Sequence, residues 1–247
     1  MIISQNTSLD LIVNQPMMLD ILLHVATLAA VVLYFRRQIG DAVLGAFRLF
    51  KASLKGKAAF TQQKEIDNGA NIALCVVVGT LPTGILGVLM SDLAGTISAT
   101  PTYLGLTFVS CAGILFASRF FQGGDRRLTV PMALIIGLAQ GIAVLPGLSR
   151  SGTTIAVALA LGVNREEAAT FSFLLSLPAI LGAAALEIDV DSLLLNGQTG
   201  AFLIGALAAF LVGLMALVFL VALVRKGRLW LFAPYLLTVG ILTLSFI

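Results

Sequence analysis

Residues 129–163 read TVPMALIIGLAQGIAVLPGLSRSGTTIAVALALGV, two apolar arms joined by a short polar stretch. A helix rises about 1.5 Å per residue, so the first arm, 129–145, is long enough to reach well across a hydrocarbon core of roughly 30 Å. The second arm, 153–163, covers only about 17 Å at the same rise. The second arm is therefore too short to complete a crossing, and the polar tip between the arms is expected to lie inside the membrane or towards its outer half.

The composition around this stretch is that of a membrane protein. Of 247 residues, 59% are hydrophobic and 11% are charged, whereas a soluble domain carries roughly a quarter charged residues. The sequence predicts an all-α fold, a polytopic membrane helical bundle that forms a single integral membrane domain over 1–247. The apolar runs long enough to span are 17–35, 70–90, 102–118, 129–145, 168–187, 201–224 and 230–247.

The basic residues predict how these spans are oriented. Lys and Arg gather in three loops that the positive-inside rule assigns to the cytoplasm: 36–68, 119–128 and 225–229. Segments without Lys or Arg are assigned to the outer side: 91–101, 188–200 and the short N-terminus 1–16. A net charge of +3 would hint at nucleic acid in a soluble protein. Here the basic loops indicate membrane orientation and contact with anionic lipid instead, and no nucleic-acid partner is expected.

These assignments of loops to the two sides of the membrane are consistent only if part of the chain turns back. Loop 119–128 is cytoplasmic and span 168–187 runs outward, so the residues between them must begin and end on the same side. We therefore predict a re-entrant helical hairpin over 129–163. An irregular tip at membrane depth is tolerated only where protein buries it or where it lines a watery cavity.

The tip of the hairpin has the composition of a phosphate site. Pro146-Gly147 ends the first helix, because Pro cannot continue it and Gly relaxes the turn. Hydroxyls and backbone N–H groups then gather at the positive end of the next helix, with one guanidinium among them. The residues expected there are Ser149, Arg150, Ser151, Gly152, Thr153 and Thr154.

A structural interpretation stays open for most of these residues. Ser and Thr are ordinary helix caps, and Arg150 could pair with an acid such as Glu187. For Arg150 the functional interpretation is favoured, because an ionisable residue deep in a membrane costs several kcal/mol. Gln140 and Ser172 could face the tip or simply join helices.

Three further residues are interpreted as structural. His24 stands one turn after Asp20, which favours a structural pair over a catalytic base. Glu166 and Glu167 are expected to be solvated at a helix start, where acids suit the helix dipole.

The hairpin and its neighbours resemble a known family. GLAQGIAVLPGLSRSGTT at 137–154, followed by GVNREEA at 162–168 and FSFLLSLP at 171–178, resembles the undecaprenyl-diphosphate phosphatases of the bacitracin-resistance type. The resemblance covers 17–247. It implies a multi-pass enzyme of the bacterial inner membrane that hydrolyses undecaprenyl diphosphate to the monophosphate. That reaction recycles the lipid carrier of peptidoglycan synthesis and lowers sensitivity to bacitracin.

The resemblance also assigns roles within an inverted-repeat fold in which each repeat contributes a re-entrant hairpin. Arg150 matches the family's phosphate-binding arginine, and the catalytic set is Arg150, Ser149 and Ser151. Substrate-binding residues are expected at Gly147, Gly152, Thr153, Thr154, Gln140 and Ser172. The implied partners are a polyprenyl diphosphate lipid and the membrane, with a homodimer left open.

One departure from the family pattern concerns the metal. The family carries a Glu-x-x-x-Glu pair and a Pro-x-Ser-Ser-x-Gly-His stretch upstream, credited with binding a divalent cation, Mg²⁺ or Ca²⁺, and with acid–base duty. Residues 1–16 contain neither, and the first glutamate is Glu65. Either the true start lies upstream or this is a shortened relative. The rival functions are a non-catalytic lipid-phosphate binder or transporter and an inert remnant of the family.

Overall fold

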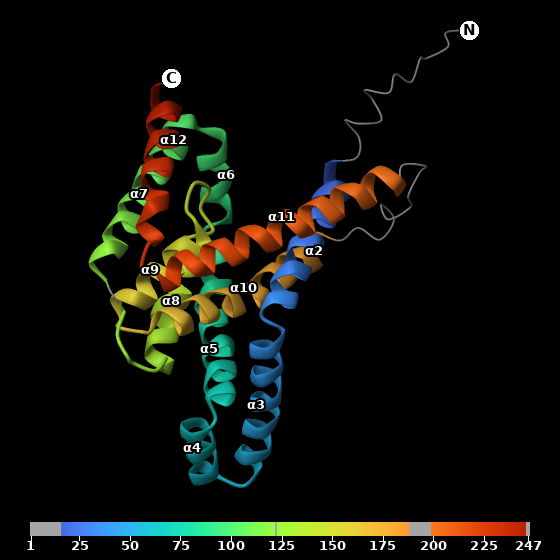
Figure 1. Ribbon diagram of the computed structural model, residues 1–247, viewed down its shortest axis with the longest axis vertical. Coiled ribbons are helices and arrows are strands. Elements are labelled where there is room, and N and C mark those ends of the chain that lie inside the picture. The colour runs from blue at the N-terminus through green and yellow to red at the C-terminus, as the bar shows by residue number, and fades with distance from the viewer. Residues whose placement is uncertain (1–15, 122, 188–198, 246–247) are drawn as a thin grey trace. The chain divides into compact units, whose positions relative to one another are not determined.

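The computed structural model describes residues 16–121, 123–187 and 199–245, with the backbone alone for 16–22, 24, 183–187 and 199–203. Helices account for most of these residues (Figure 1). They are α2 (Pro16–Tyr34), α3 (Arg36–Leu54), α4 (Lys57–Ile66), α5 (Asn68–Leu89), α6 (Ser91–Ala99), α7 (Pro101–Ala117), α8 (Val130–Ile142), α9 (Arg150–Ala160), α10 (Arg165–Glu187), α11 (Thr199–Arg225) and α12 (Ala233–Ser245), with 3-10 turns at Ser118–Phe120 and Leu229–Phe232. Within the described ranges, β pairing is limited to one bridge between Arg126 and Val163. The all-α prediction is confirmed.

Three described helical segments are long and apolar enough to cross a membrane: Asn68–Leu89, Pro101–Phe120 and Ile204–Arg225. They coincide with the predicted spans 70–90, 102–118 and 201–224. Shorter apolar helices occur at Val25–Tyr34, Val130–Ile142 and Leu229–Ser245. The chain is therefore a membrane helical bundle, as its composition predicted.

The basic segment 36–68 is not the loop that we expected. It forms α3 and α4, and segment 91–101, also predicted to be a loop, likewise contains α6. In α3 the residues Gly45, Leu49 and Ala52 recur at helical spacing and are buried, while the charged residues lie elsewhere on the helix. The many Lys and Arg residues hid this amphipathic pattern from a search for long apolar runs.

The described chain falls into two compact units. The first takes in Met1–Tyr34 and Ile180–Val218, and in it Gly213 of α11 faces Thr27 of α2. The second takes in Phe35–Ala179 and Phe219–Ile247 and contains every candidate site residue. The hairpin can therefore be described within one unit.

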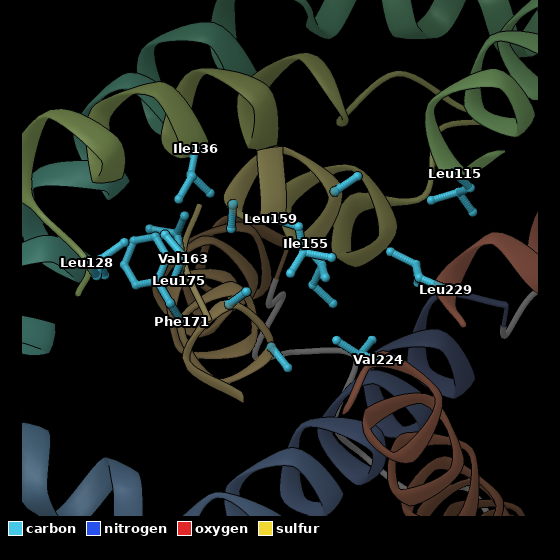
Figure 2. Packing of buried hydrophobic residues seen from close by; sticks show 14 of the residues in the cluster. Leu115, Leu128, Ile136, Ile155, Leu159, Val163, Phe171, Leu175, Val224 and Leu229 are labelled. Atoms are coloured by element: carbon cyan, nitrogen blue, oxygen red, sulfur yellow. The ribbon is translucent and has the colours of Figure 1, made fainter. Parts of the chain in front are cut away.

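The second unit is built around α9. Ile155, Ala158 and Leu159 of this helix are buried, and Figure 2 shows Ile155 and Leu159 within one cluster together with Phe171 and Leu175 of α10. Helix α9 also packs against α8 and α7. Because α9 is buried on several sides, its apolar side chains make many close van der Waals contacts, and these contacts hold the helix in place.

Candidate phosphate site

The predicted hairpin is present as α8, an irregular turn and α9. Helix α8 ends at Ile142, three residues before the predicted end of the arm, and is about 20 Å long at helical rise. Helix α9 starts at Arg150, earlier than the predicted 153. Arg126 N donates to Gly162 O at 3.3 Å, just outside the two ends of the hairpin. The segment therefore returns to the place where it started, as the orientation of the spans required.

The turn is shaped by Gly147 and held by Thr107 of α7. Gly147 has φ +90°, in the left-handed region that favours glycine. Thr107 Oγ1 donates to Pro146 O at 2.6 Å, and a Cβ on Gly147 would come within 2.3 Å of that same hydroxyl oxygen. Glycine is thus required both by the backbone and by the close approach of α7. Nothing in the sequence pointed to Thr107.

Ser149 begins α9 as its N-cap. Its Oγ accepts from Gly152 N at 3.1 Å, and its own N–H donates to Cys111 Sγ at 3.2 Å. The first helical bond runs from Thr153 N to Ser149 O at 2.8 Å. The N–H groups of Arg150 and Ser151 therefore precede the helical ladder, and they are free to donate to an anion.

Arg150 is half-buried at the first position of this helix. Among the described residues, no acceptor lies within hydrogen-bond or ion-pair distance of its guanidinium. The alternative Arg150–Glu187 pair lies outside the described side chains, as does the Asp20–His24 pair. Ser149 and Ser151 flank Arg150 and are also only partly buried. Three accessible polar residues thus stand together at the positive end of a helix.

The other predicted hydroxyls lie deeper. Thr154 and Ser172 are 0% and 2% exposed, and their hydroxyl oxygens are 2.5 Å apart. Thr153 is 5% exposed, and among the described atoms its hydroxyl has no hydrogen-bond partner. Gly152 packs so closely that a Cβ would meet Leu115 Cδ2 at 2.8 Å. These residues join α9 to its neighbours from within the core.

Gln140 occupies a third position, at the crossing of α5, α8 and α10. It is fully buried, and its Nε2 donates to Leu175 O at 3.1 Å. Thr83 of α5 lies 3.5 Å from the same nitrogen and donates to Gly137 O at 2.9 Å. Gln140 Oε1 has no described partner. The contacts of Gln140 therefore match the interpretation in which this residue joins helices.

The expectation for Glu167 was wrong in part. Glu166 is exposed as expected and pairs with Arg225 at 2.7 Å, but Glu167 is 8% exposed. Asn164 Oδ1 accepts from Glu167 N at 2.8 Å, and Asn164 Nδ2 donates to the Glu167 carboxylate at 3.3 Å. Helix α10 therefore begins with a reciprocal cap. The sequence already shows this capping pattern, with Asn164 followed three residues later by Glu167.

The described residues do not supply a set of ligands for a divalent cation. No group of three or more His, Cys, Asp or Glu side chains gathers in the part of the chain that the structure describes. The candidate site is itself cationic, and no step is assigned to a metal here.

Three cavities lie along α3, α4 and α5, and none of the three is lined by residues of the turn.

Comparison with known proteins identifies the family of this chain. The family model described as bacitracin resistance protein BacA matches residues 1–242. The chain belongs to the bacitracin resistance protein BacA family. The resemblance seen in the hairpin is thereby confirmed over nearly the whole chain.

Three proteins similar to this chain carry the same name. An undecaprenyl-diphosphatase of Desulfatibacillum aliphaticivorans is 44% identical over 227 residues, which cover 91% of this chain and 82% of that protein. An undecaprenyl-diphosphatase of Treponema denticola is 40% identical over 231 residues, covering 92% of this chain and 81% of that protein. An undecaprenyl-diphosphatase of Korarchaeum cryptofilum is 37% identical over 226 residues, covering 91% and 82%.

Proposed function

We propose that this protein hydrolyses undecaprenyl diphosphate to undecaprenyl phosphate and inorganic phosphate. The observation that carries the proposal is the half-buried Arg150 at the N-terminus of α9, without a described anionic partner and flanked by Ser149 and Ser151. A guanidinium and free helix N–H groups favour a phosphate over a neutral ligand. Membership of the BacA family supports the choice of a lipid diphosphate.

Each residue at the start of α9 has a definite part in this proposal. The Arg150 fork holds two oxygens of the terminal phosphate and stabilises the charge on it as water attacks its phosphorus and the bond to the undecaprenyl phosphate leaving group breaks. The N–H groups of Arg150 and Ser151 donate to the same phosphate. Ser149 Oγ accepts from Gly152 N, so its hydrogen stays available to donate, and the Ser151 hydroxyl lies on the other side of Arg150.

The buried residues position this group. Gly147 allows the tight turn and Gly152 the close approach of α7. Thr154 and Ser172 join α9 to α10, Gln140 joins α8 to α10, and Thr153 lies buried in α9. The proposed setting is a multi-pass protein of the bacterial inner membrane, with the hairpin tip reached from the outer face. Recycling of the lipid carrier there would support peptidoglycan synthesis and resistance to bacitracin. The resemblance implies Mg²⁺ or Ca²⁺ as cofactor and leaves a homodimer open, but no group of ligands for the cation gathers among the described residues.

The proposal is tested by phosphate release from a polyprenyl diphosphate in detergent. We expect Arg150→Ala to lose about a hundredfold in kcat/KM, as when one preorganised transition-state donor is removed. Arg150→Lys should recover only part of the rate, because it keeps the charge and loses the fork. Arg228→Ala removes an exposed arginine elsewhere in the same unit and should leave the rate unchanged.

Two results would contradict the proposal. Activity of Arg150→Ala within about twofold of the wild type would remove Arg150 from the site. Tight binding of the lipid without phosphate release, under conditions in which a relative is active, would instead point to a lipid-phosphate binder or transporter.

A further inference from the structure

Helix α3 carries three different faces along its length. Its buried face, Gly45, Leu49 and Ala52, lies against the start of α5, and a Cβ on Gly45 would come within 2.2 Å of Ala70 N. A second face is apolar and exposed: Val43, Phe47, Phe50 and Leu54 follow one another at spacings of four, three and four residues. A third face is basic and carries Arg48, Lys51 and Lys55.

The apolar face is unusually open for side chains of this size. Val43, Phe47, Phe50 and Leu54 are 63%, 57%, 63% and 74% exposed. At 100° per residue, this face points away from α5, and the basic face lies at about a right angle to both. The Lys51 ammonium lies 4.5 Å from the Phe47 ring centroid, so the basic and apolar faces meet there. Helices of this kind lie where acyl chains give way to headgroups.

The basic face opens into a cavity of about 440 Å³ between α3 and α4. Its polar lining consists of Arg48, Lys51 and Lys55 from α3 with Gln62 and Gln63 from α4. None of the residues that line this cavity is acidic. The cavity therefore presents cations and amide groups, the donors that an oxyanion requires.

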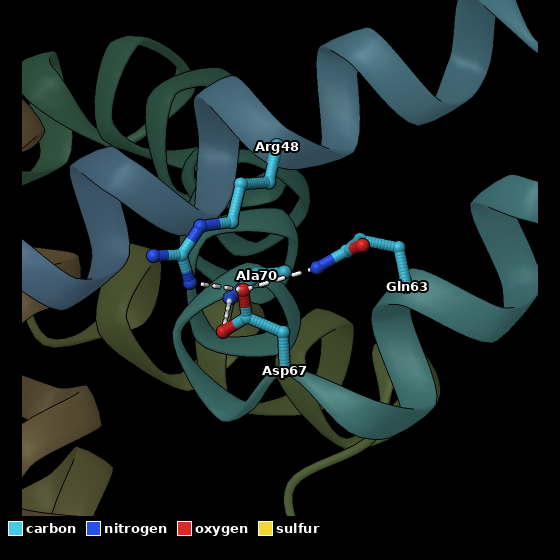
Figure 3. Close-up of polar contacts among 4 residues, drawn as sticks. All are labelled: Arg48, Gln63, Asp67 and Ala70. Atoms are coloured by element: carbon cyan, nitrogen blue, oxygen red, sulfur yellow. Dashed lines mark hydrogen bonds and ion pairs between the residues drawn. The ribbon is translucent and has the colours of Figure 1, made fainter.

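Not all of this charge is free. Asp67 pairs with Arg48 at 3.0 Å, accepts from Gln63 Nε2 at 3.2 Å and caps α5 by accepting from Ala70 N at 3.2 Å (Figure 3). Burial alone would raise the pKa of Asp67, but these hydrogen bonds and the Arg48 charge hold it below the usual range. Arg48 is thus largely neutralised. Lys51 and Lys55 have no ion pair among the described residues.

The position of the cavity puts it at a membrane surface. Asp67 directly precedes Asn68, where the membrane-spanning helix α5 begins. Gln63 contacts Asp67 and also lines the cavity. The start of a spanning helix lies near the headgroups, so the cavity faces the layer in which lipid phosphates are found.

We propose that this cavity binds the phosphate headgroup of an anionic phospholipid. Lys51 and Lys55 contact the phosphate, Gln62 and Gln63 donate to the headgroup, and Val43, Phe47, Phe50 and Leu54 lie among the acyl chains. Two free ammonium groups match a diester phosphate that carries one negative charge, and the adjoining apolar face matches its chains. This site serves to anchor the α3–α4 segment and does not depend on the proposed phosphatase activity.

The test is lipid binding by the full chain in detergent, followed by native mass spectrometry. Wild type should retain phosphatidylglycerol and release phosphatidylcholine of the same acyl composition. Lys51→Gln with Lys55→Gln should lower the affinity for phosphatidylglycerol roughly thirtyfold, since each of the two basic residues near a headgroup contributes about 1 kcal/mol. Lys226→Gln with Arg228→Gln removes two exposed cations elsewhere and should leave that affinity unchanged.

Further arms separate the lipid from other occupants. Phe50→Gln with Leu54→Gln should also weaken phosphatidylglycerol binding, because the acyl contact is lost. Unchanged binding in Lys51→Gln/Lys55→Gln, or equal retention of phosphatidylcholine, overturns the proposal. So does displacement of the lipid by inorganic phosphate at equal concentration, which assigns the cavity to free anions. A change from dimer to monomer in Phe50→Gln/Leu54→Gln with lipid binding intact assigns the apolar face to a second copy. Circular dichroism checks that every variant is folded.

Discussion

The hydroxyl pair of Thr154 and Ser172 ties the site helix α9 to α10, with both side chains buried and their oxygens 2.5 Å apart. Thr154→Val keeps the shape of the side chain but leaves Ser172 without this partner in the core. We expect it to lower the free energy of unfolding by about 1–3 kcal/mol, the cost of an unsatisfied buried polar group. Thermal unfolding in detergent measures this loss.

A double-mutant cycle tells the pair apart from two independent hydroxyls. Thr154→Val combined with Ser172→Ala should cost less than the sum of the single changes, by about 1 kcal/mol, because both partners are then removed. Thr238 is exposed and bonds only within its own helix, so Thr238→Val is the matched control and should be nearly neutral. Additive losses at Thr154 and Ser172 would show that the contact contributes nothing.

Residue chemistry made part of the candidate site predictable. A Pro-Gly step followed by Ser149 and Arg150 predicts a helix start with a cap and a cation, and both are present. The sequence did not show which hydroxyls would be buried, because Thr154 and Ser172 are far apart in the chain and meet only after α9 and α10 pack together. Glu167 was missed for a related reason: an acid at a helix start suits the dipole whether water or protein surrounds it.

Between elements, α5 and α8 approach each other closely. A Cβ on Gly137 would lie 2.2 Å from Gly79 O, so Gly137→Ala forces the two helices apart. We expect a loss of about 1–3 kcal/mol in stability and a lower unfolding temperature. Gly84 lies in α5 with open space around it, and Gly84→Ala should be neutral or slightly stabilising. Equal unfolding temperatures for the two variants would contradict this account of the crossing.

A helix was predictable from the sequence where a single property, such as the length of an apolar run, distinguishes it. α5, α7 and α11 follow from the length of their apolar runs. α3 and α4 do not, because charged residues interrupt their apolar runs, and in α3 the spacing of Gly45, Leu49 and Ala52 reveals the buried face. The ends of α8 and α9 differ from the predicted arms because the turn is fixed by Thr107 on another helix, a contact that no local pattern reports.

At the scale of the whole molecule, the return of the hairpin was predicted from charge alone. A basic loop assigned to the cytoplasm on one side and a span predicted to run outward on the other left no other path for this segment. In the structure Arg126 N donates to Gly162 O, so the two ends of the segment lie side by side. The orientation rule concerns loops and spans, so it cannot say how closely the two arms pack. Nor can it say how closely the first arm packs against α5, which depends on Gly137 and Gly141, both buried in α8 and facing α5.

Orientation in the membrane gives the last prediction. Asp92, Asp125 and Ser151 are replaced by cysteine one at a time and treated with a membrane-impermeant maleimide. Cys75 and Cys111 are 0% exposed and should stay silent, because only water-accessible thiolates react. Asp92→Cys and Ser151→Cys should be labelled in right-side-out spheroplasts, whereas Asp125→Cys should be labelled only in inverted vesicles. The reason is that the basic loop around Asp125 stays in the cytoplasm while the first arm carries Ser151 towards the opposite face. Labelling of Ser151→Cys from the same side as Asp125→Cys would place the hairpin tip on the cytoplasmic side and remove its access to a substrate arriving from outside.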